Sequence, residues 1–216
     1  MNKILVIDVG GNNLKIFATG AKEPRRTPSG PKMTAATMCA AVRQLAVGWT
    51  YDAVSIGYPG PVAENRPTRE PANLAAGWTK FDYEKALGKP VRMVNDAAMQ
   101  ALGSYEGGRM LFLGLGTGLG SAMIVYDQLV PMELAHLPYR KGKSYEDYLG
   151  DRGRRRLGRK KWTRHVTLVV EMLRAALEVD YVVLGGGNVR KLAKLPPKIR
   201  LGDNSHAFTG GFRLWK

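Results

Sequence analysis

Two short glycine-rich turns are the segments of this 216-residue sequence best suited to hold phosphate. The first is Gly10-Gly11-Asn12-Asn13 and the second is Gly116-Thr117-Gly118. Glycine lets the backbone adopt positive φ and approach a phosphate without a Cβ in the way. Successive backbone N–H groups in such a turn form a concave anion-binding nest. The two turns therefore predict two phosphate-binding loops.

Each turn lies between two apolar segments that have the character of strands. Residues 3–8 and 14–19 flank the first turn, and residues 110–114 and 120–126 flank the second. A turn between antiparallel strands differs from a Walker or Rossmann loop, because those loops open a helix. The two strand–turn–strand units lie half the chain apart, which indicates an internal duplication into two similar α/β halves. Chance similarity of two short hairpins is the open alternative.

The segments around these hairpins complete an alternating pattern of strands and helices. Apolar spacing predicts helices over residues 34–47, 97–102 and 166–177, the last of them preceded by a basic helical stretch. Short apolar runs predict strands over residues 53–58, 91–94 and 181–184. Residues 62–80 are rich in Pro, Asn and Gly and predict an irregular loop.

The charge of the chain indicates an acidic partner. The formal net charge is +15, and residues 140–164 hold eleven Lys and Arg against Glu146, Asp147 and Asp151. Such a concentration suits a polyanion, a nucleic acid or a membrane surface. A solvated surface is the alternative, since these side chains cannot all share one helix face. No nucleic-acid module is recognisable, which disfavours that partner.

Composition indicates the cellular compartment of the protein. Cys39 is the only cysteine, so an intramolecular disulfide and a multi-cysteine structural zinc site are excluded. No run approaches the roughly 18 to 20 apolar residues of a membrane span. The first eight residues are typical of a strand and lack the apolar length of a signal peptide. We expect a cytoplasmic protein without membrane contact.

Five motifs in order resemble those of the ROK-family sugar kinases. Residues 8–15 and 115–120 resemble the two phosphate motifs, Asn95-Asp96 the catalytic pair, Glu133-Leu134-Ala135-His136 the Glu–x–Gly–His sugar motif, and residues 146–148 a further sugar-contacting segment. Residues 136–150, 156–162 and 210–215 resemble the polyphosphate glucokinase branch of that family. The sequence departs at Asn12, where Thr or Ser is usual, at Ala98, where another polar residue is common, and at Ala135, which replaces Gly.

The resemblance implies catalytic and metal roles for two carboxylates. Asp96 would accept the proton of a sugar 6-hydroxyl, although it could instead merely cap the helix that follows. A helix N-terminus is expected to hold the pKa of Asp96 low. Asp8 would bind Mg²⁺, with a turn-forming hydrogen bond as the alternative. Lys15 would either reach a phosphate or remain a solvated strand residue.

The resemblance also implies a sugar site and a donor site. Sugar hydroxyls would pair with Asn73, Asn95, Asp96, Glu133, His136 and Glu146. The phosphate cradle would be formed by Gly10, Gly11, Asn12, Asn13, Lys15, Gly116, Thr117 and Gly118. A polyphosphate track would include Lys141, Lys143, Arg152, Arg155, Arg156, Arg159, Lys160 and Lys161. If ATP is used, its base would pack at Gly185, Gly186 and Gly187, although that turn could persist for folding reasons alone.

The predicted fold is α/β, with two actin-like (ASKHA, ribonuclease H-like) lobes around a central cleft, residues 1–96 and 97–216. The predicted activity is a polyphosphate-dependent glucokinase that phosphorylates the 6-hydroxyl of glucose, with mannose left open. Mg²⁺ is the expected cofactor, polyphosphate the expected donor and ATP a further donor, and the family suggests a homodimer. An ATP-dependent hexokinase is the first alternative. A non-catalytic polyanion- or nucleic-acid-binding protein on a kinase scaffold is the second.

Overall fold

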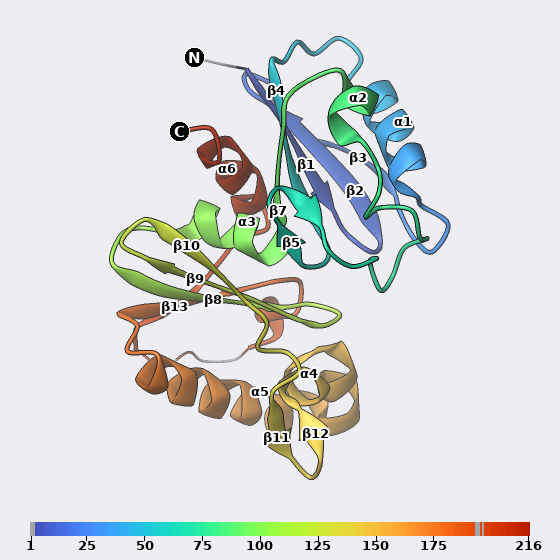
Figure 1. The fold of residues 1–216 in the computed structure, drawn as a ribbon. Coiled ribbons are helices and arrows are strands. Elements are labelled where there is room, and N and C mark those ends of the chain that lie inside the picture. The colour runs from blue at the N-terminus through green and yellow to red at the C-terminus, as the bar shows by residue number, and fades with distance from the viewer. Residues whose placement is uncertain (1–2, 193–194, 196) are drawn as a thin grey trace. The chain divides into compact units, whose positions relative to one another are not determined.

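The structure, a computed structural model, describes residues 3–192, 195 and 197–216. The chain forms two compact units, Met1–Met99 with Ala207–Lys216 and Gln100–His206, called here the first and second unit. Each unit contains one five-stranded sheet (Figure 1). Residues 1 and 2 of the first predicted lobe and residues 193, 194 and 196 of the second lie outside the described residues.

The first unit has a sheet with the strand order β3-β2-β1-β4-β7. β1 pairs antiparallel with β2 and β2 with β3, whereas β4 and β7 run parallel to β1. The strands are β1 (Ile4–Val9), β2 (Asn13–Ala18), β3 (Arg25–Pro28), β4 (Ala53–Tyr58) and β7 (Val91–Asn95). The smaller elements are α1 (Ala35–Leu45), α2 (Tyr83–Leu87), β5 (Val62–Ala63) and β6 (Arg66–Pro67).

Strand β1 is buried on both faces because alternate residues enter two different cores. Leu5 and Ile7 belong to the core that includes α1. Ile4 and Val6 pack in the smaller core that contains Met99 and residues of α6 (His206–Arg213). An apolar run without polar alternation is the pattern expected for a strand covered on both faces.

The second unit has a sheet with the strand order β10-β9-β8-β13-β14. Its strands are β8 (Arg109–Leu115), β9 (Leu119–Val125), β10 (Gln128–Met132), β13 (Tyr181–Gly185) and β14 (Ile199–Leu201). The other elements are β11 (Pro138–Arg140), β12 (Lys143–Ser144), α4 (Tyr145–Leu149), α5 (Asp151–Ala176) and the 3₁₀ helix η1 (Val189–Lys191). Helix α3 (Asp96–Ser104) contains one point where the chain passes between units, and the other lies at the start of α6.

The two sheets have the same topology. In each, three consecutive strands pair antiparallel, and two later strands add in parallel beside the first of the three. The shared order and directions support the internal duplication indicated by the two glycine hairpins. Both hairpins occupy the same place, between the first two strands of their sheet.

The predicted elements agree with the structure except in three places. Residues 62–80 contain the short β5–β6 pair. The predicted helix over 166–177 is the end of α5, which starts at Asp151 and is interrupted at Gly158, where φ is 72° and ψ is 160°. Residues 97–99 and 207–216, assigned from sequence to the second lobe, belong to the first unit, where Met99, Ala207 and Phe208 pack with Ile4 and Val6. Every helix among the described residues is too short or too polar to cross a bilayer.

Candidate active site

Asp8 lies near the end of β1 and is paired with a lysine on the next strand. The antiparallel register places Asp8 opposite Lys15, and Lys15 Nζ donates to Asp8 Oδ2 at 3.1 Å. Asp8 is 8% exposed, whereas a third of the Lys15 side chain is accessible. Lys15 is therefore not a free solvated residue, since it neutralises a nearly buried carboxylate.

Asp8 and Asp96 lie on the same face of the first sheet. Asp8 is paired with Gly57 of β4, and paired residues of a sheet point to the same face. A Cβ at Gly57 would lie 3.6 Å from the Asp96 Cα, so α3 starts directly over this glycine. The absence of a side chain at Gly57 lets α3 approach the sheet and brings the two carboxylates together.

The pKa of Asp96 is raised to about 7. Burial is the largest cause, and the charge of Asp8 adds to it. Hydrogen bonds from the amides of Ala97 and of Asp96 itself act in the opposite direction. The predicted low pKa was therefore wrong, because burial and a second carboxylate outweigh the helix N-terminus.

Asn95 caps helix α3 and is thereby fixed beside Asp96. Its Oδ1 accepts from the amides of Ala97 at 2.9 Å and Ala98 at 3.3 Å, and its Nδ2 donates to the Gly60 carbonyl at 3.0 Å. Asp96 Oδ1 also accepts from Ala97, at 2.8 Å. The capping role considered for Asp96 is thus carried mainly by Asn95, which keeps one further N–H for a ligand.

The first glycine hairpin is held by Ser29. The Ser29 amide donates to the Asn12 carbonyl at 3.1 Å, and its hydroxyl donates to the Gly10 carbonyl at 2.5 Å. Among the described residues, nothing accepts from the amides of Gly11 and Asn12. The carbonyls are therefore tied down while two adjacent N–H groups stay available for an anion.

Asn73 lies against this hairpin. A Cβ at Gly11 would lie 3.3 Å from the Asn73 Cβ, so glycine is needed for the approach. The loop that carries Asn73 is closed by Glu70, whose carboxylate accepts from the amides of Gly77, Trp78 and Thr79 at 3.0 to 3.2 Å. The structure therefore brings Asn73, Asp8, Lys15, Asn95, Asp96 and the hairpin together in the first unit.

Glu70 was missed from sequence. Desolvation pushes the pKa of Glu70 upward, but hydrogen bonds from the Thr79 hydroxyl and from three amides outweigh it and lower the pKa. The available signal was an acidic residue ahead of a Gly-Trp-Thr turn, which is a suitable acceptor for several turn amides.

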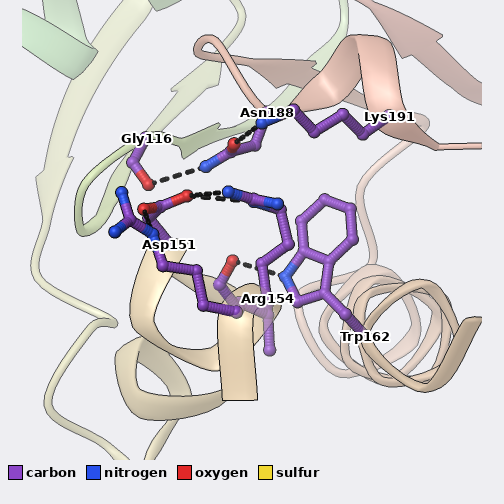
Figure 2. Close-up of polar contacts among 8 residues, drawn as sticks. Gly116, Asp151, Arg154, Trp162, Asn188 and Lys191 are labelled. Carbon is purple, nitrogen blue, oxygen red and sulfur yellow. Dashed lines mark hydrogen bonds and ion pairs between the residues drawn. The ribbon is translucent and has the colours of Figure 1, made fainter. Parts of the chain in front are cut away.

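The second hairpin is held from two sides by its own unit. Asn188 Nδ2 donates to the Gly116 carbonyl at 3.0 Å (Figure 2). The Asp151 amide donates to the carbonyls of Gly116 and Thr117 at 3.1 and 3.2 Å. Among the described residues, nothing accepts from the amides of Thr117 and Gly118. This hairpin thus repeats the arrangement of the first, with fixed carbonyls and open amides.

Glu146 lies directly against the second hairpin. Its Oε2 accepts from the Leu119 amide at 3.0 Å, and any side chain at Gly118 would collide with this carboxylate. The Glu146 amide donates to the Ala135 carbonyl at 3.0 Å, which joins α4 to the segment of Glu133 and His136. Glu133 and His136 are both exposed. The second unit therefore gathers the hairpin, Glu133, His136 and Glu146.

The Gly185-Gly186-Gly187 turn has a visible folding role. Gly186 has a φ of 86°, and a Cβ there would lie 2.6 Å from the Leu115 carbonyl oxygen. The Asn188 amide donates to the same oxygen at 3.0 Å. The turn thus packs on the strand that leads into Gly116, and its predicted contact with a nucleotide base stays a prediction.

Some side chains of the predicted polyphosphate track donate hydrogen bonds within the protein, and others do not. Arg155 donates to Asp151 at 2.6 Å, Arg156 to the Asp147 carbonyl at 2.8 Å and Arg159 to the Lys191 carbonyl at 2.7 Å. The members that are exposed and donate to no described residue are Lys141, Lys143, Arg152, Lys160 and Lys161. Asp151 forms ion pairs with Arg154 at 2.7 Å and Arg155 at 2.6 Å, and Figure 2 shows the pair with Arg154 beside Gly116.

No family model matches this chain. Solved structures match its whole length. A polyphosphate/ATP-glucomannokinase from Arthrobacter sp. strain KM aligns over 100% of both chains with a TM-score of 0.84 and 23% identity. A ROK family glucokinase from Streptomyces griseus, in complex with glucose and AMPPNP, aligns over 98% of both chains with a TM-score of 0.78 and 16% identity. The chain has the fold of the ROK sugar kinases, which confirms the predicted class of actin-like α/β lobes.

Two mycobacterial relatives are named polyphosphate glucokinase. The protein from Mycobacterium leprae is 27% identical, and the alignment covers 88% of this chain and 65% of the relative. The protein from Mycobacterium tuberculosis strain CDC 1551 is 28% identical, with 88% of this chain and 80% of the relative covered. The chain thus spans less than two thirds of the Mycobacterium leprae relative. The predicted resemblance to ROK kinases, and among them to polyphosphate glucokinases, is confirmed.

Proposed function

We propose that the protein is a polyphosphate-dependent glucokinase that transfers a terminal phosphoryl group to the 6-hydroxyl of glucose. The observation that carries the proposal is Asp96, a carboxylate with a pKa of about 7 at the start of α3 beside Asp8. A general base is most effective when its pKa lies near the working pH. The similarity to proteins named polyphosphate glucokinase supports the choice of donor and acceptor.

In the proposed reaction Asp96 accepts the proton of the glucose 6-hydroxyl. The hydroxyl oxygen forms a bond to the terminal phosphorus while the bridging P–O bond of the donor breaks. The products are glucose 6-phosphate and a polyphosphate one unit shorter. Positioning and charge stabilisation dominate such transfers, so the fixed place of Asp96 matters as much as its basicity.

Each unit has side chains that are suitable partners for sugar hydroxyls. In the first unit, the open N–H of Asn95 and the amide of Asn73 are suitable partners for hydroxyls. In the second unit, Glu133, His136 and the free Oε1 of Glu146 are suitable partners. A site that bonds sugar hydroxyls discriminates strongly against analogues that lack them.

The open amides of each hairpin, and Lys15 in the first unit, are each suited to bind phosphate. Asp8 fits a role in holding Mg²⁺, because it offers a hard oxygen, Oδ1, that accepts from no described residue. No group of three or more His, Cys, Asp and Glu side chains suited to a metal occurs in the described parts of the chain. A single carboxylate is nevertheless sufficient for Mg²⁺ when phosphates and waters supply the other ligands. When bound, the ion would neutralise charge on the donor phosphates.

An ATP-dependent hexose kinase is the second candidate function. The Gly185-Gly186-Gly187 turn favours it through its resemblance to the turn where ROK kinases pack a nucleotide base. The name of the Arthrobacter protein, which includes both polyphosphate and ATP, supports testing both donors. The same name includes mannose, which we treat as a further acceptor to test.

Glucose 6-phosphate formation with polyphosphate or ATP as donor tests the proposal, with Mg²⁺ present and Asp96→Asn as the control. Turnover with polyphosphate that is lost in the variant would support it. Turnover with ATP alone would replace polyphosphate by the second candidate. No turnover with either donor, on glucose or mannose, would refute both.

We also propose a cytoplasmic homodimer. The single cysteine, Cys39, is buried and unpaired, which suits a reducing compartment. Leu168 and Met172 are 45% and 42% exposed and lie four residues apart on α5, so they form an apolar stripe suited to a contact with a second copy. Light scattering of the wild type and of Leu168→Glu would test the dimer.

A further inference from the structure

An aromatic cluster in the second unit gathers arginines from separate elements. Tyr139 of β11, Tyr148 of α4 and His165 of α5 stack edge to face, with ring centroids 4.8 to 5.7 Å apart. The Tyr139 hydroxyl and His165 Nδ1 are 3.0 Å apart. The β11–β12 hairpin, α4 and α5 are thereby fixed to one another, and they lie together in Figure 1.

Three arginines surround this cluster. The guanidinium of Arg156 lies 5.1 Å from the Tyr148 ring centroid, and that of Arg140 lies 5.8 Å from the Tyr139 ring centroid. Arg164 immediately precedes His165 on α5. All three arginines are exposed, and Arg156 is further held by its bond to the Asp147 carbonyl. Cations distant in sequence are therefore placed on one rigid surface.

The charge on this surface is poorly compensated. Burial lowers the pKa of His165, and the charges of Arg140, Arg164 and Arg156 lower it further. Asp147 is the nearby carboxylate, and the pKa of Asp147 is lowered by bonds from Ser144 and by the charges of Lys143 and Arg156. Arg140, Arg156 and Arg164 act on His165, while Lys143 and Arg156 act on Asp147, an excess of positive charge that favours binding a polyanion.

Helix α4 connects this surface with the second glycine hairpin. Glu146 contacts the hairpin while Tyr148, two residues later, packs in the aromatic cluster, so they point to different sides of α4. A helix of five residues is only about 7 Å long. A polymeric anion whose end lies at the hairpin could therefore extend to the arginines.

We propose that Arg140 and Arg156, which contact rings of the Tyr139–Tyr148–His165 cluster, and Arg164, which precedes His165, bind phosphate units of a polyphosphate chain beyond those at the Gly116-Thr117-Gly118 hairpin. The inference rests on the proposed function and adds two arginines, Arg140 and Arg164, to the predicted track. Polyphosphate fits better than single-stranded nucleic acid, because nucleic-acid sites offer open aromatic faces for bases. Here Tyr148 is buried, at 7% exposure, and the partly exposed rings of Tyr139 and His165 pack on it and on each other.

Binding of long-chain polyphosphate and of tripolyphosphate, without glucose, tests the proposal in the wild type and in Arg140→Gln/Arg164→Gln. Neither side chain makes a hydrogen bond to a described residue, so the fold should persist, and a circular dichroism spectrum checks this. We expect affinity for the long chain to fall roughly tenfold, with a much smaller change for tripolyphosphate. By analogy with single-stranded nucleic acid, the slope of log affinity against log salt should decrease by about 1.4 for two lost contacts.

Lys22→Gln/Lys89→Gln is the matched control, since it removes the same charge from exposed positions in the first unit. Unchanged affinity for the long chain in the arginine variant, or an equal loss in the lysine variant, would overturn the inference. Tighter binding of single-stranded RNA than of polyphosphate of equal charge, lost in the arginine variant, would overturn it in favour of a nucleic-acid partner. A wild type that binds long chains but forms no glucose 6-phosphate would refute the proposed function and leave this inference standing.

Discussion

Replacing Asp96 by Asn should stabilise the first unit while removing activity. The Asp96 carboxylate has a pKa of about 7 against a usual value of 3.8. The difference of about three pKa units corresponds to about 4 kcal/mol at 1.36 kcal/mol per unit. Because Asp96 is only half-buried, solvent screens part of this penalty, and we expect a gain of about 1 to 3 kcal/mol. Asn can still accept the Ala97 amide bond, so little is lost.

The stability gained by Asp96→Asn should increase with pH. Between about pH 4 and pH 7 the folded state retains a proton on Asp96 that the unfolded state has released, so the stability of the wild type falls as pH rises. Above about pH 7 both states are ionised and the difference becomes constant. The advantage of Asp96→Asn should therefore be smaller at pH 5 than at pH 8.

Native-state hydrogen exchange of β1 and β4 measures this difference within the first unit. Comparing both proteins at one pH cancels the intrinsic exchange rate. Glu23→Gln, at an exposed position of the same unit, is the control and should show no pH-dependent difference. Adding Asp8→Asn should reduce the gain, since the Asp8 charge is the second cause of the raised pKa. A gain that is the same at pH 5 and pH 8 would refute the reasoning.

Three further predictions concern the same site and its supports. The kcat/KM for glucose should rise with pH through an apparent pKa near 7, and Asp8→Asn should move that pKa downward; a profile unaffected by Asp8→Asn would contradict the pairing of the two carboxylates. Glu70→Gln should raise the KM for glucose severalfold more than it lowers kcat, because it loosens the loop that holds Asn73 against Gly11; equal effects on both constants would argue for a different role. Gly186→Ala should cost the second unit about 2 kcal/mol or more, measured by chemical unfolding, whereas Gly187→Ala, which meets no atom within 4 Å and has no positive φ, should cost little.

The sequence predicted the positions of the hairpins and the carboxylates well because local signals specify them. The apolar run before Asp8 and the glycines after it define a strand and a turn without reference to the rest of the chain. The boundaries of β4, Ala53–Tyr58, were predicted to the residue, since Pro59 and Gly60 end the strand. Family resemblance then assigned roles that spacing alone could not.

Features that depend on contacts distant in sequence were not predictable. The raised pKa of Asp96 results from its burial in the folded chain and from the charge of Asp8, which lies on another strand. The arginines around His165 come from three separate positions on two elements, and only the folded chain shows them together. The membership of α6 in the first unit follows from its packing on Ile4 and Val6, for which a linear reading offers no signal.

The division of the chain into units has a consequence for synthesis. The second unit is inserted within the first, and the two ends of the insertion are close, with the Ser104 hydroxyl 2.9 Å from His206 Nδ1. During translation the first sheet emerges earliest, yet the face that α3 covers in part lacks the rest of its packing until Ala207 and Phe208 are made. The second unit, which starts later, can thus be completed sooner than the first. Until α6 has been made, the exposed apolar face of β1 makes the nascent chain prone to aggregation.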